Sequence, residues 1–204
     1  MTRLQRALRR LSRDLNDLGE RWALVGGLAV SARAEPRTTR DVDVAVAVPG
    51  DRDAEGLVMR LVSRGYRVFC QLEHTDAGRL AGMRLFSPEG GDSGLIVDLL
   101  FASSGIEKEV VEAAQDLELT PGWSVPVART GHLLALKVLA SQPEHPEARP
   151  QDIPDALALL RVADEEELRR ARESLAVIED RGYARGKNLE ERLEALLQRP
   201  QVIE

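Results

Sequence analysis

Two aspartates separated by one residue, Asp41 and Asp43, are the most informative chemical feature of the sequence. Valine occupies every second position from 42 to 48 around them, which is the period-two pattern of a strand. Side chains two residues apart on a strand leave the same face, so both carboxylates are directed to one place. Paired carboxylates repel each other unless a cation lies between them, and hard oxygen ligands of this kind suit Mg²⁺ or Mn²⁺. Solvated acids on an exposed strand face are the alternative.

Three further features could complete such a site. Gly26 and Gly27 lie between a short apolar run and a predicted helix, where backbone N–H groups can approach a phosphate. Asp98 is a charged residue inside an apolar strand, and a buried carboxylate needs a cation or hydrogen-bond donors. A salt bridge at the strand end would satisfy it equally well. Arg37 and Arg40 place positive charge just before the aspartate pair.

The composition limits the classes of function. The chain has 204 residues and a net charge of −6, which fits one domain or one domain with a helical appendage. Aromatic residues, at 3%, are too few for a platform that stacks bases. The single cysteine, Cys70, permits neither an intrachain disulfide nor a Cys-based zinc cluster, which predicts a reducing, cytoplasmic setting. With no apolar run of membrane-spanning length and no leader pattern, we expect neither export nor a membrane span.

The charge is distributed unevenly along the chain. The first 40 residues hold nine arginines and four acidic residues, although the whole chain is acidic. This basic end is a candidate anion-facing surface. The alternative is that the arginines form the solvated side of an amphipathic helix.

Apolar spacing predicts an α/β (α+β) fold, with a mixed sheet flanked by helices and a helical C-terminal half. Strands are expected at 22–25, 42–48, 66–72, 80–87 and 95–101. Helices are expected at 4–18, 28–34, 51–64, 107–115, 130–140, 154–160, 165–178 and 189–197. The glycine-rich segment 90–94 predicts a hairpin turn, and the proline-rich segment 141–150 a loop. We therefore expect a catalytic α/β core in 1–104 and a mainly helical part in 105–204 that flanks the cleft.

The order of these motifs resembles the active-site signature of the polymerase-β-type nucleotidyltransferases. Residues 24–30 and 37–43 are more closely similar to the AbiEii/MenT branch, whose members are toxins of bacterial toxin–antitoxin pairs. Three later segments resemble its third-carboxylate strand (97–102), its lysine-bearing helix (133–137) and its Arg-x-x-Asp-x-x-Asp element (149–155). In the last element, Gln151 and Pro154 depart from the family pattern. The resemblance covers most of residues 22–160.

The resemblance implies roles for individual residues. In a two-metal scheme, Asp41 and Asp43 would hold Mg²⁺ or Mn²⁺ ions that bridge the nucleotide phosphates, and Asp98 would complete the site of the ion that activates the attacking hydroxyl. Lys137 would contact the phosphates of an NTP, although its stem could also snorkel to solvent from an apolar helix. Asp152 would hold Lys137 or a nearby arginine, or else would be an ordinary first-turn acid of a helix. The residues expected to bind the nucleotide are Gly26, Gly27, Arg37, Arg40 and Lys137. For Arg37 and Arg40, surface salt bridges to nearby acids are the alternative.

The reaction implied by the resemblance is transfer of a nucleotide from an NTP to an acceptor hydroxyl, by in-line attack at the α-phosphate. The family implies a tRNA or another RNA 3′ end as acceptor and a cognate antitoxin as partner. A small hydroxylated molecule such as an antibiotic is the alternative acceptor, and a binding protein without turnover is the alternative class. His74, His132 and His145 show no ligand spacing and are predicted to be ordinary surface or capping residues.

Overall fold

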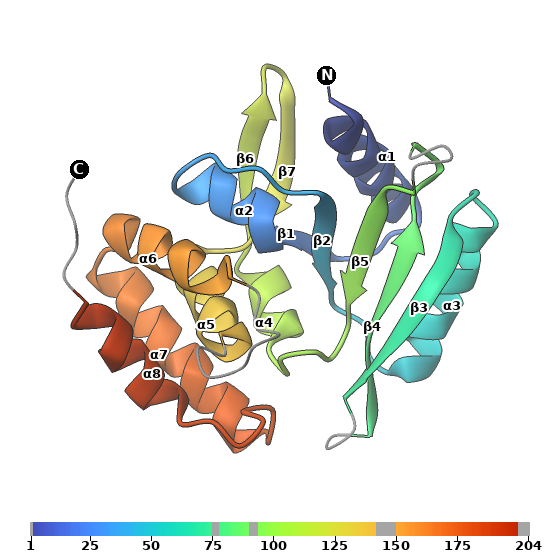
Figure 1. Cartoon of the computed structure of the whole chain (residues 1–204). Coiled ribbons are helices and arrows are strands. Elements are labelled where there is room, and N and C mark those ends of the chain that lie inside the picture. Colours follow the sequence, from blue (N-terminus) through green and yellow to red (C-terminus); the bar gives the residue numbers. More distant parts are fainter. Residues whose placement is uncertain (1, 75–77, 90–93, 142–149, 200–204) are drawn as a thin grey trace.

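A computed structural model describes residues 2–74, 78–89, 94–141 and 150–199. The described strands form one mixed sheet in the order β3-β4-β5-β2-β1-β7-β6 (Figure 1). These strands are β1 (Trp22–Val25), β2 (Asp41–Val46), β3 (Arg67–His74), β4 (Arg79–Phe86), β5 (Ile96–Leu100), β6 (Gln115–Thr120) and β7 (Trp123–Val127). The helices are α1 (Arg3–Asp17), α2 (Gly26–Arg33), α3 (Asp51–Val62), α4 (Glu107–Glu112), α5 (Thr130–Ala140), α6 (Asp152–Val162), α7 (Glu165–Asp180) and α8 (Leu189–Leu197).

The predicted mixed sheet flanked by helices is confirmed, with one omission. Residues 115–127 form the β6–β7 hairpin inside the part that was expected to be mainly helical. β7 pairs in parallel with β1, so the sheet extends past residue 104. The division into 1–104 and 105–204 stays a prediction. The expected turn at 90–94 and loop at 141–150 lie almost entirely outside the described residues.

The helices form two groups around the sheet. In Figure 1, α3 lies behind β3 and β4, whereas α5, α6, α7 and α8 stand together beside the other end of the sheet. The arginine-rich helix α1 buries the stripe that contains Leu8, Leu11 and Leu15. Its arginines thereby remain on the outer side, as an amphipathic pattern requires. A capping box between Thr2 and Gln5 begins this helix, because each side chain accepts from the other's backbone N–H.

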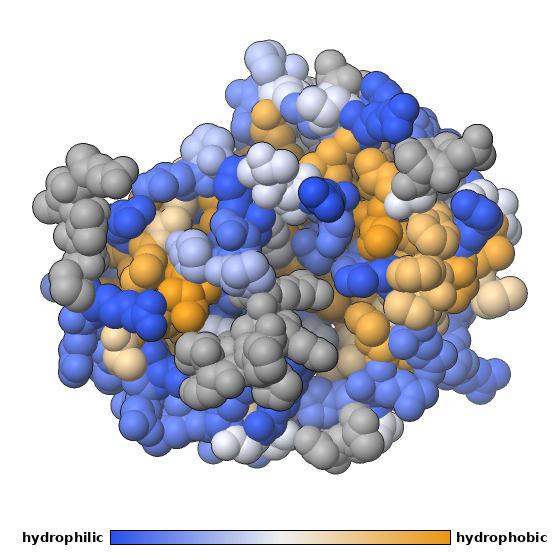
Figure 2. Space-filling view, viewed as in Figure 1, coloured by the Kyte–Doolittle hydropathy of each residue, from blue (hydrophilic) through white to orange (hydrophobic). Residues whose placement is uncertain are grey.

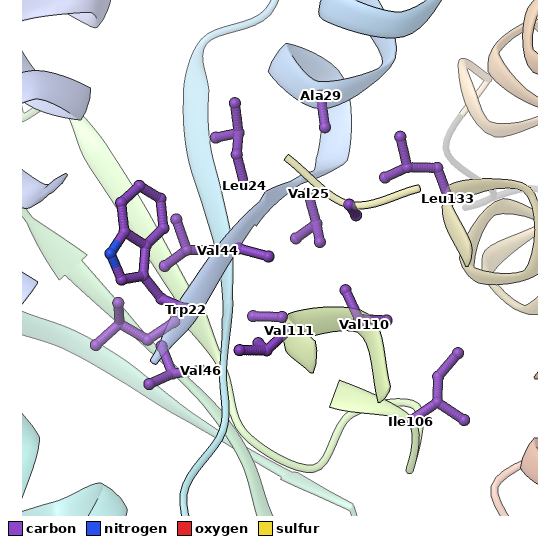
Figure 3. Close-up of a cluster of buried hydrophobic side chains, with 14 of the residues drawn as sticks. Trp22, Leu24, Val25, Ala29, Val44, Val46, Ile106, Val110, Val111 and Leu133 are labelled. Atoms are coloured by element: carbon purple, nitrogen blue, oxygen red, sulfur yellow. The ribbon is translucent and has the colours of Figure 1, made fainter. Parts of the chain in front are cut away.

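The core beneath the site is built by the alternating valines of β2. Val42, Val44 and Val46 are fully buried, while Asp41 and Asp43 leave the opposite face. Figure 3 shows Val44 and Val46 of β2 beside Val110 and Val111 of α4. This packing holds β2 from behind, so its carboxylate face is presented on a rigid strand.

Part of the outer surface is hydrophobic, at the end of the sheet formed by β3, β4 and β5. Hydrophobic side chains gather over the β3–β5 end (Figure 2), and Val68 and Phe69 of the edge strand β3 are about half exposed. Within the described part of the chain, no helix has both the length and the apolar character needed to cross a membrane.

Helix α5 is fixed to α7 by a close contact at a glycine. The backbone N–H of Gly131 donates to Glu167 Oε2 at 2.7 Å. A Cβ at Gly131 would lie 2.3 Å from the Glu167 carbonyl oxygen, so a side chain could not be accommodated there. The two helices therefore pack as one unit, which sets the position of Lys137 on α5.

Buried His132 on α5 predicts a pH dependence of stability. Burial lowers the pKa of His132 to about 4, and the charge of Arg170 acts in the same direction. The unfolded chain takes up this proton near pH 6.5 and the folded chain near pH 4, so stability falls as the pH drops through that window. We expect this residue to account for up to about 3 kcal/mol of the loss between pH 7 and pH 4. Urea unfolding of His132→Gln should show a flatter profile; identical slopes would contradict the assignment.

Candidate active site

The three predicted carboxylates come from two adjacent parallel strands. Asp43 of β2 and Asp98 of β5 are direct partners in the strand register. Partners across a ladder project from the same face of the sheet, and Asp41 shares this face because it lies two residues from Asp43. Residues far apart in the sequence are thereby brought side by side. The sheet register confirms that Asp41, Asp43 and Asp98 share a face.

Asp98 is held by a cation of the neighbouring strand. Arg84 of β4 is its register partner on the other side. Arg84 donates from Nε to Asp98 Oδ1 at 2.7 Å and from Nη2 to Oδ2 at 2.6 Å, which is a bidentate pair. Hydrogen bonding to Asp98 raises the pKa of Arg84, and the negative charges of Asp98 and Asp41 also raise it. The buried Asp98 carboxylate is therefore neutralised within the sheet, as its apolar surroundings require.

Gly26 lets the chain turn directly against Asp43. Its φ is +62°, in the left-handed region that favours glycine. A Cβ at this position would lie 2.1 Å from Asp43 Oδ2, so the carboxylate packs on the bare Cα. At Gly27, a Cβ would lie 2.6 Å from Arg37 Nη2. The paired glycines thus make room for one carboxylate and one guanidinium at the start of α2.

Replacing Gly26 with alanine should displace Asp43 as well as strain the backbone. Gly19 is the matched control, because its φ is +72° and a methyl group added there would meet nothing within 4 Å. Gly19→Ala should lose about 1–2 kcal/mol, the penalty of the left-handed conformation. Gly26→Ala should lose more, and it should also abolish the nucleotide transfer that the family resemblance implies. Equal losses in urea unfolding, with transfer retained in both variants, would show that the Asp43 contact has no role.

A second charged cluster joins α5, α6 and the segment that precedes β2. Lys137 Nζ lies 2.9 Å from Asp152 Oδ1 and 2.8 Å from Asp155 Oδ2. Arg37 donates from Nη2 to Asp155 Oδ2 at 2.7 Å, and its Nε lies 2.6 Å from Oδ1. Both aspartates are in the first turn of α6 and almost fully buried. Two cations thus balance two carboxylates and tie the helices to the glycine turn.

A cleft of about 740 Å³ lies between the sheet and these helices. Its wall contains Gly26, Asp43 and Asp98 from the sheet side. Lys137 and Asp152 line it from α5 and α6, and Arg84 and Arg185 add positive charge. The structure therefore assembles acids and cations from distant parts of the sequence around one space. This is the arrangement that phosphoryl chemistry needs, since it depends on positioning and charge neutralisation.

Some predicted site residues lie outside the cleft wall. Arg37 is engaged by Asp155, and Arg40 is exposed. Asp41 lies at the β2 edge of the site, half-buried on the carboxylate face. Arg149, the first residue of the predicted Arg-x-x-Asp-x-x-Asp element, falls outside the described residues.

Sequence reasoning missed Arg84 and misjudged the histidines. Arg84 lies in a predicted strand, but its pairing with Asp98 depends on which strands are neighbours, and a local pattern does not contain that information.

His74 and His132 were expected at the surface or in caps, and both are buried. His74 lines the cleft and its ring lies 4.6 Å from that of Tyr183, between centroids. His145 lies outside the described residues.

The donor set fits a divalent ion, and the two-metal mechanism stays a prediction. Asp41 and Asp43 supply oxygen ligands from one strand, which suits Mg²⁺ because it keeps several waters and is completed by substrate phosphates. Both oxygens of Asp98 already accept from Arg84. Among the described residues, no three His, Cys, Asp or Glu side chains gather as a preformed metal cage. The role of Asp98 as a metal ligand stays a prediction.

Comparisons with known proteins identify the family and the fold. The sequence matches the family described as "Nucleotidyl transferase AbiEii toxin, Type IV TA system" over residues 6–202. A comparison with curated proteins gives no match. The fold is similar to an antigenic nucleotidyltransferase-like protein from Paracoccidioides brasiliensis, with a TM-score of 0.53 and 19% identity over 95% of this chain and 93% of that chain.

The fold is also similar to that of the antibiotic-resistance factor ANT(2″)-Ia. One of its structures gives a TM-score of 0.56 and 16% identity, covering 93% of this chain and 96% of that chain. Another structure, in complex with adenylyl-2″-tobramycin, gives a TM-score of 0.54 and 16% identity, covering 87% of this chain and 98% of that chain. At these identities the likeness shows a shared fold. Because the family match extends over nearly the whole sequence, the chain belongs to the AbiEii nucleotidyl transferase toxin family.

Proposed function

We propose that the protein transfers a nucleotide from an NTP to an acceptor hydroxyl, with a divalent ion at Asp41 and Asp43, as the toxin of a toxin–antitoxin pair. The observation that carries this proposal is the convergence of Asp41, Asp43 and Asp98 on one sheet face, against Gly26, in a chain of this family. A cognate antitoxin is then the expected protein partner.

The carboxylates and the glycine turn would position the triphosphate. Asp41 and Asp43 would hold Mg²⁺ or Mn²⁺, which when bound neutralises charge on the phosphates and polarises the reacting phosphorus. The turn at Gly26 and Gly27 would bring the first N–H groups of α2 close to the phosphates. An acceptor hydroxyl in line with the α-phosphate would form the new P–O bond while the bond to pyrophosphate breaks.

Cations of the cleft would carry the remaining phosphate charge. Lys137 is ion-paired to two aspartates, so its ammonium is held in place before any substrate arrives. Arg185 lines the same cleft from the segment that follows α7. In this account Asp152 is a positioning residue, because it acts on the phosphates through Lys137.

An RNA is the acceptor class that the charge distribution supports best. Trp123 and four arginines of α1 line a hollow of about 540 Å³; the arginines are Arg6, Arg9, Arg10 and Arg13. The Arg9 guanidinium lies 5.6 Å from the centre of the Trp123 ring, and Arg9 and Arg13 are both exposed. Exposed arginines can bind a phosphate backbone. An acidic chain with a local basic face can bind a structured RNA without binding every polyanion.

The test is transfer of label from each of the four α-labelled NTPs, with Mg²⁺ or Mn²⁺, to purified tRNA, total RNA or a panel of aminoglycosides and lincosamides. We expect label in the RNA. The double variant Arg9→Ala with Arg13→Ala should lower transfer to RNA. Label that enters small molecules alone would reject the RNA acceptor while keeping the enzyme class. No label in any acceptor, with equal results for wild type and Asp43→Asn, would favour a binding protein.

A further inference from the structure

We propose that Arg84 is a built-in cation of the active centre: it takes the place of a second divalent ion at Asp98, so the site works with one metal ion, at Asp41 and Asp43. This inference rests on the proposed function and concerns how the same centre is charged. Arg84 stands in none of the motifs from which the family resemblance was drawn.

The geometry assigns Asp98 to Arg84 through the whole carboxylate. The two hydrogen bonds, of 2.7 and 2.6 Å, use both Asp98 oxygens and the Nε and Nη2 nitrogens of Arg84. Such a fork-on-fork pair is planar and directional, and it uses one lone pair on each oxygen, so a metal ion at Asp98 would have to bind beside the guanidinium. The Asp98 side chain is 5% exposed and that of Arg84 22%, so neither is an exposed surface group.

The charges around Arg84 point the same way. Strand register places Arg84, Asp98 and Asp43 next to one another across β4, β5 and β2. The negative charge of Asp41 also acts on Arg84. The guanidinium is therefore embedded among carboxylates, the position in which a divalent ion would otherwise be needed to relieve their repulsion. The Arg84 guanidinium relieves this repulsion permanently, because an arginine keeps its charge at every pH of interest.

A second ion at Asp98 would meet this fixed positive charge. The ion would have to bind a mostly buried carboxylate that is already neutralised and would lie within a few ångströms of the guanidinium, which repels it. Both printed hydrogen bonds of Arg84 go to Asp98, so its positive charge is held at that carboxylate. One ion, completed by waters and substrate phosphates, is the outcome that these contacts favour.

The inference can be tested by counting Mn²⁺ ions with electron paramagnetic resonance. The full chain is titrated with Mn²⁺ in the presence of the non-hydrolysable α,β-methylene analogue of each of the four NTPs. Wild type should bind about one Mn²⁺ per ternary complex, and Asp98→Asn should bind the same number because Asp98 is not a ligand. Arg84→Gln frees Asp98 and should raise the count to about two. Arg84→Lys, which keeps the charge, should stay at about one.

The outcomes separate this inference from the function on which it rests. Two ions in wild type that fall to one in Asp98→Asn, or a count that stays at one in Arg84→Gln, would overturn the role of Arg84. The proposed function is tested separately. It stands, whichever way the Arg84 result falls, if the wild type transfers nucleotide and Asp43→Asn loses the ion that the wild type binds. No Mn²⁺ bound with any analogue would overturn both. If Arg84→Gln does not fold by circular dichroism, the comparison of wild type with Asp98→Asn decides.

Discussion

Asp43→Asn should reduce kcat/KM for nucleotide transfer by about 10³-fold or more, because the metal at this carboxylate is expected to supply several kcal/mol of stabilisation to the transition state. The substitution keeps the size and shape of the side chain and removes its charge. Asp43 packs against Gly26 and leaves the strand face opposite the core, so we expect the urea midpoint to change little. Transfer of label from an α-labelled NTP measures the effect.

The matched control is Asp116→Asn, the same chemical change on the exposed hairpin strand β6. It should transfer nucleotide at the wild-type rate. If kcat/KM fell by less than about tenfold in Asp43→Asn, the metal site would be contradicted, because loss of a metal ligand should lower kcat/KM by much more than tenfold.

Lys137→Met should lower the free energy of unfolding by about 3 kcal/mol, near the lower end of the range for breaking a buried ion pair. The methionine leaves Asp152 and Asp155 almost fully buried, and among the described residues Arg37 is then the cation that contacts them. Arg37 pairs with Asp155, so Asp152 loses the counter-charge that Lys137 supplies within the described part of the chain. Urea unfolding at pH 7 measures the change.

Two further variants serve as controls for this result. Lys108→Met, on the exposed side of α4, should stay within about 0.5 kcal/mol of wild type, as most surface substitutions do. Adding Asp152→Asn to Lys137→Met should recover part of the loss, because it removes the uncompensated charge. A decrease below about 1 kcal/mol in Lys137→Met would mean that the cluster is solvated and does not tie α5 to α6.

Local periodicity was sufficient to predict the parts of the fold that position the carboxylates. The alternating valines of β2 indicated both the strand and the shared face of Asp41 and Asp43, because side-chain direction on a strand follows from spacing alone. Asp98 was identifiable because a charge inside an apolar strand needs a partner. Helix α1 followed from its leucine spacing, as its buried stripe confirms.

Features that depend on tertiary pairing were not predictable in the same way. The β6–β7 hairpin carries a short alternation, Leu117 with Leu119 and Val125 with Val127, interrupted in its second strand by Pro126. The pairing of Arg84 with Asp98 exists because β4 and β5 are neighbours, which only the sheet order reveals. The start of α2 at Gly26 instead of Leu28 also depends on a distant residue, because the close approach of Asp43 sets the turn.

The most direct test of the central claim compares NTPs labelled at the α-phosphate with the same NTPs labelled at the γ-phosphate, using the wild-type chain, RNA and Mg²⁺ or Mn²⁺. Nucleotide transfer predicts that the α-label becomes covalently attached to the RNA and that the γ-label leaves as pyrophosphate. Attachment of the γ-label would show phosphoryl transfer of another kind, and it would contradict the account in which Asp41 and Asp43 direct attack to the α-phosphate.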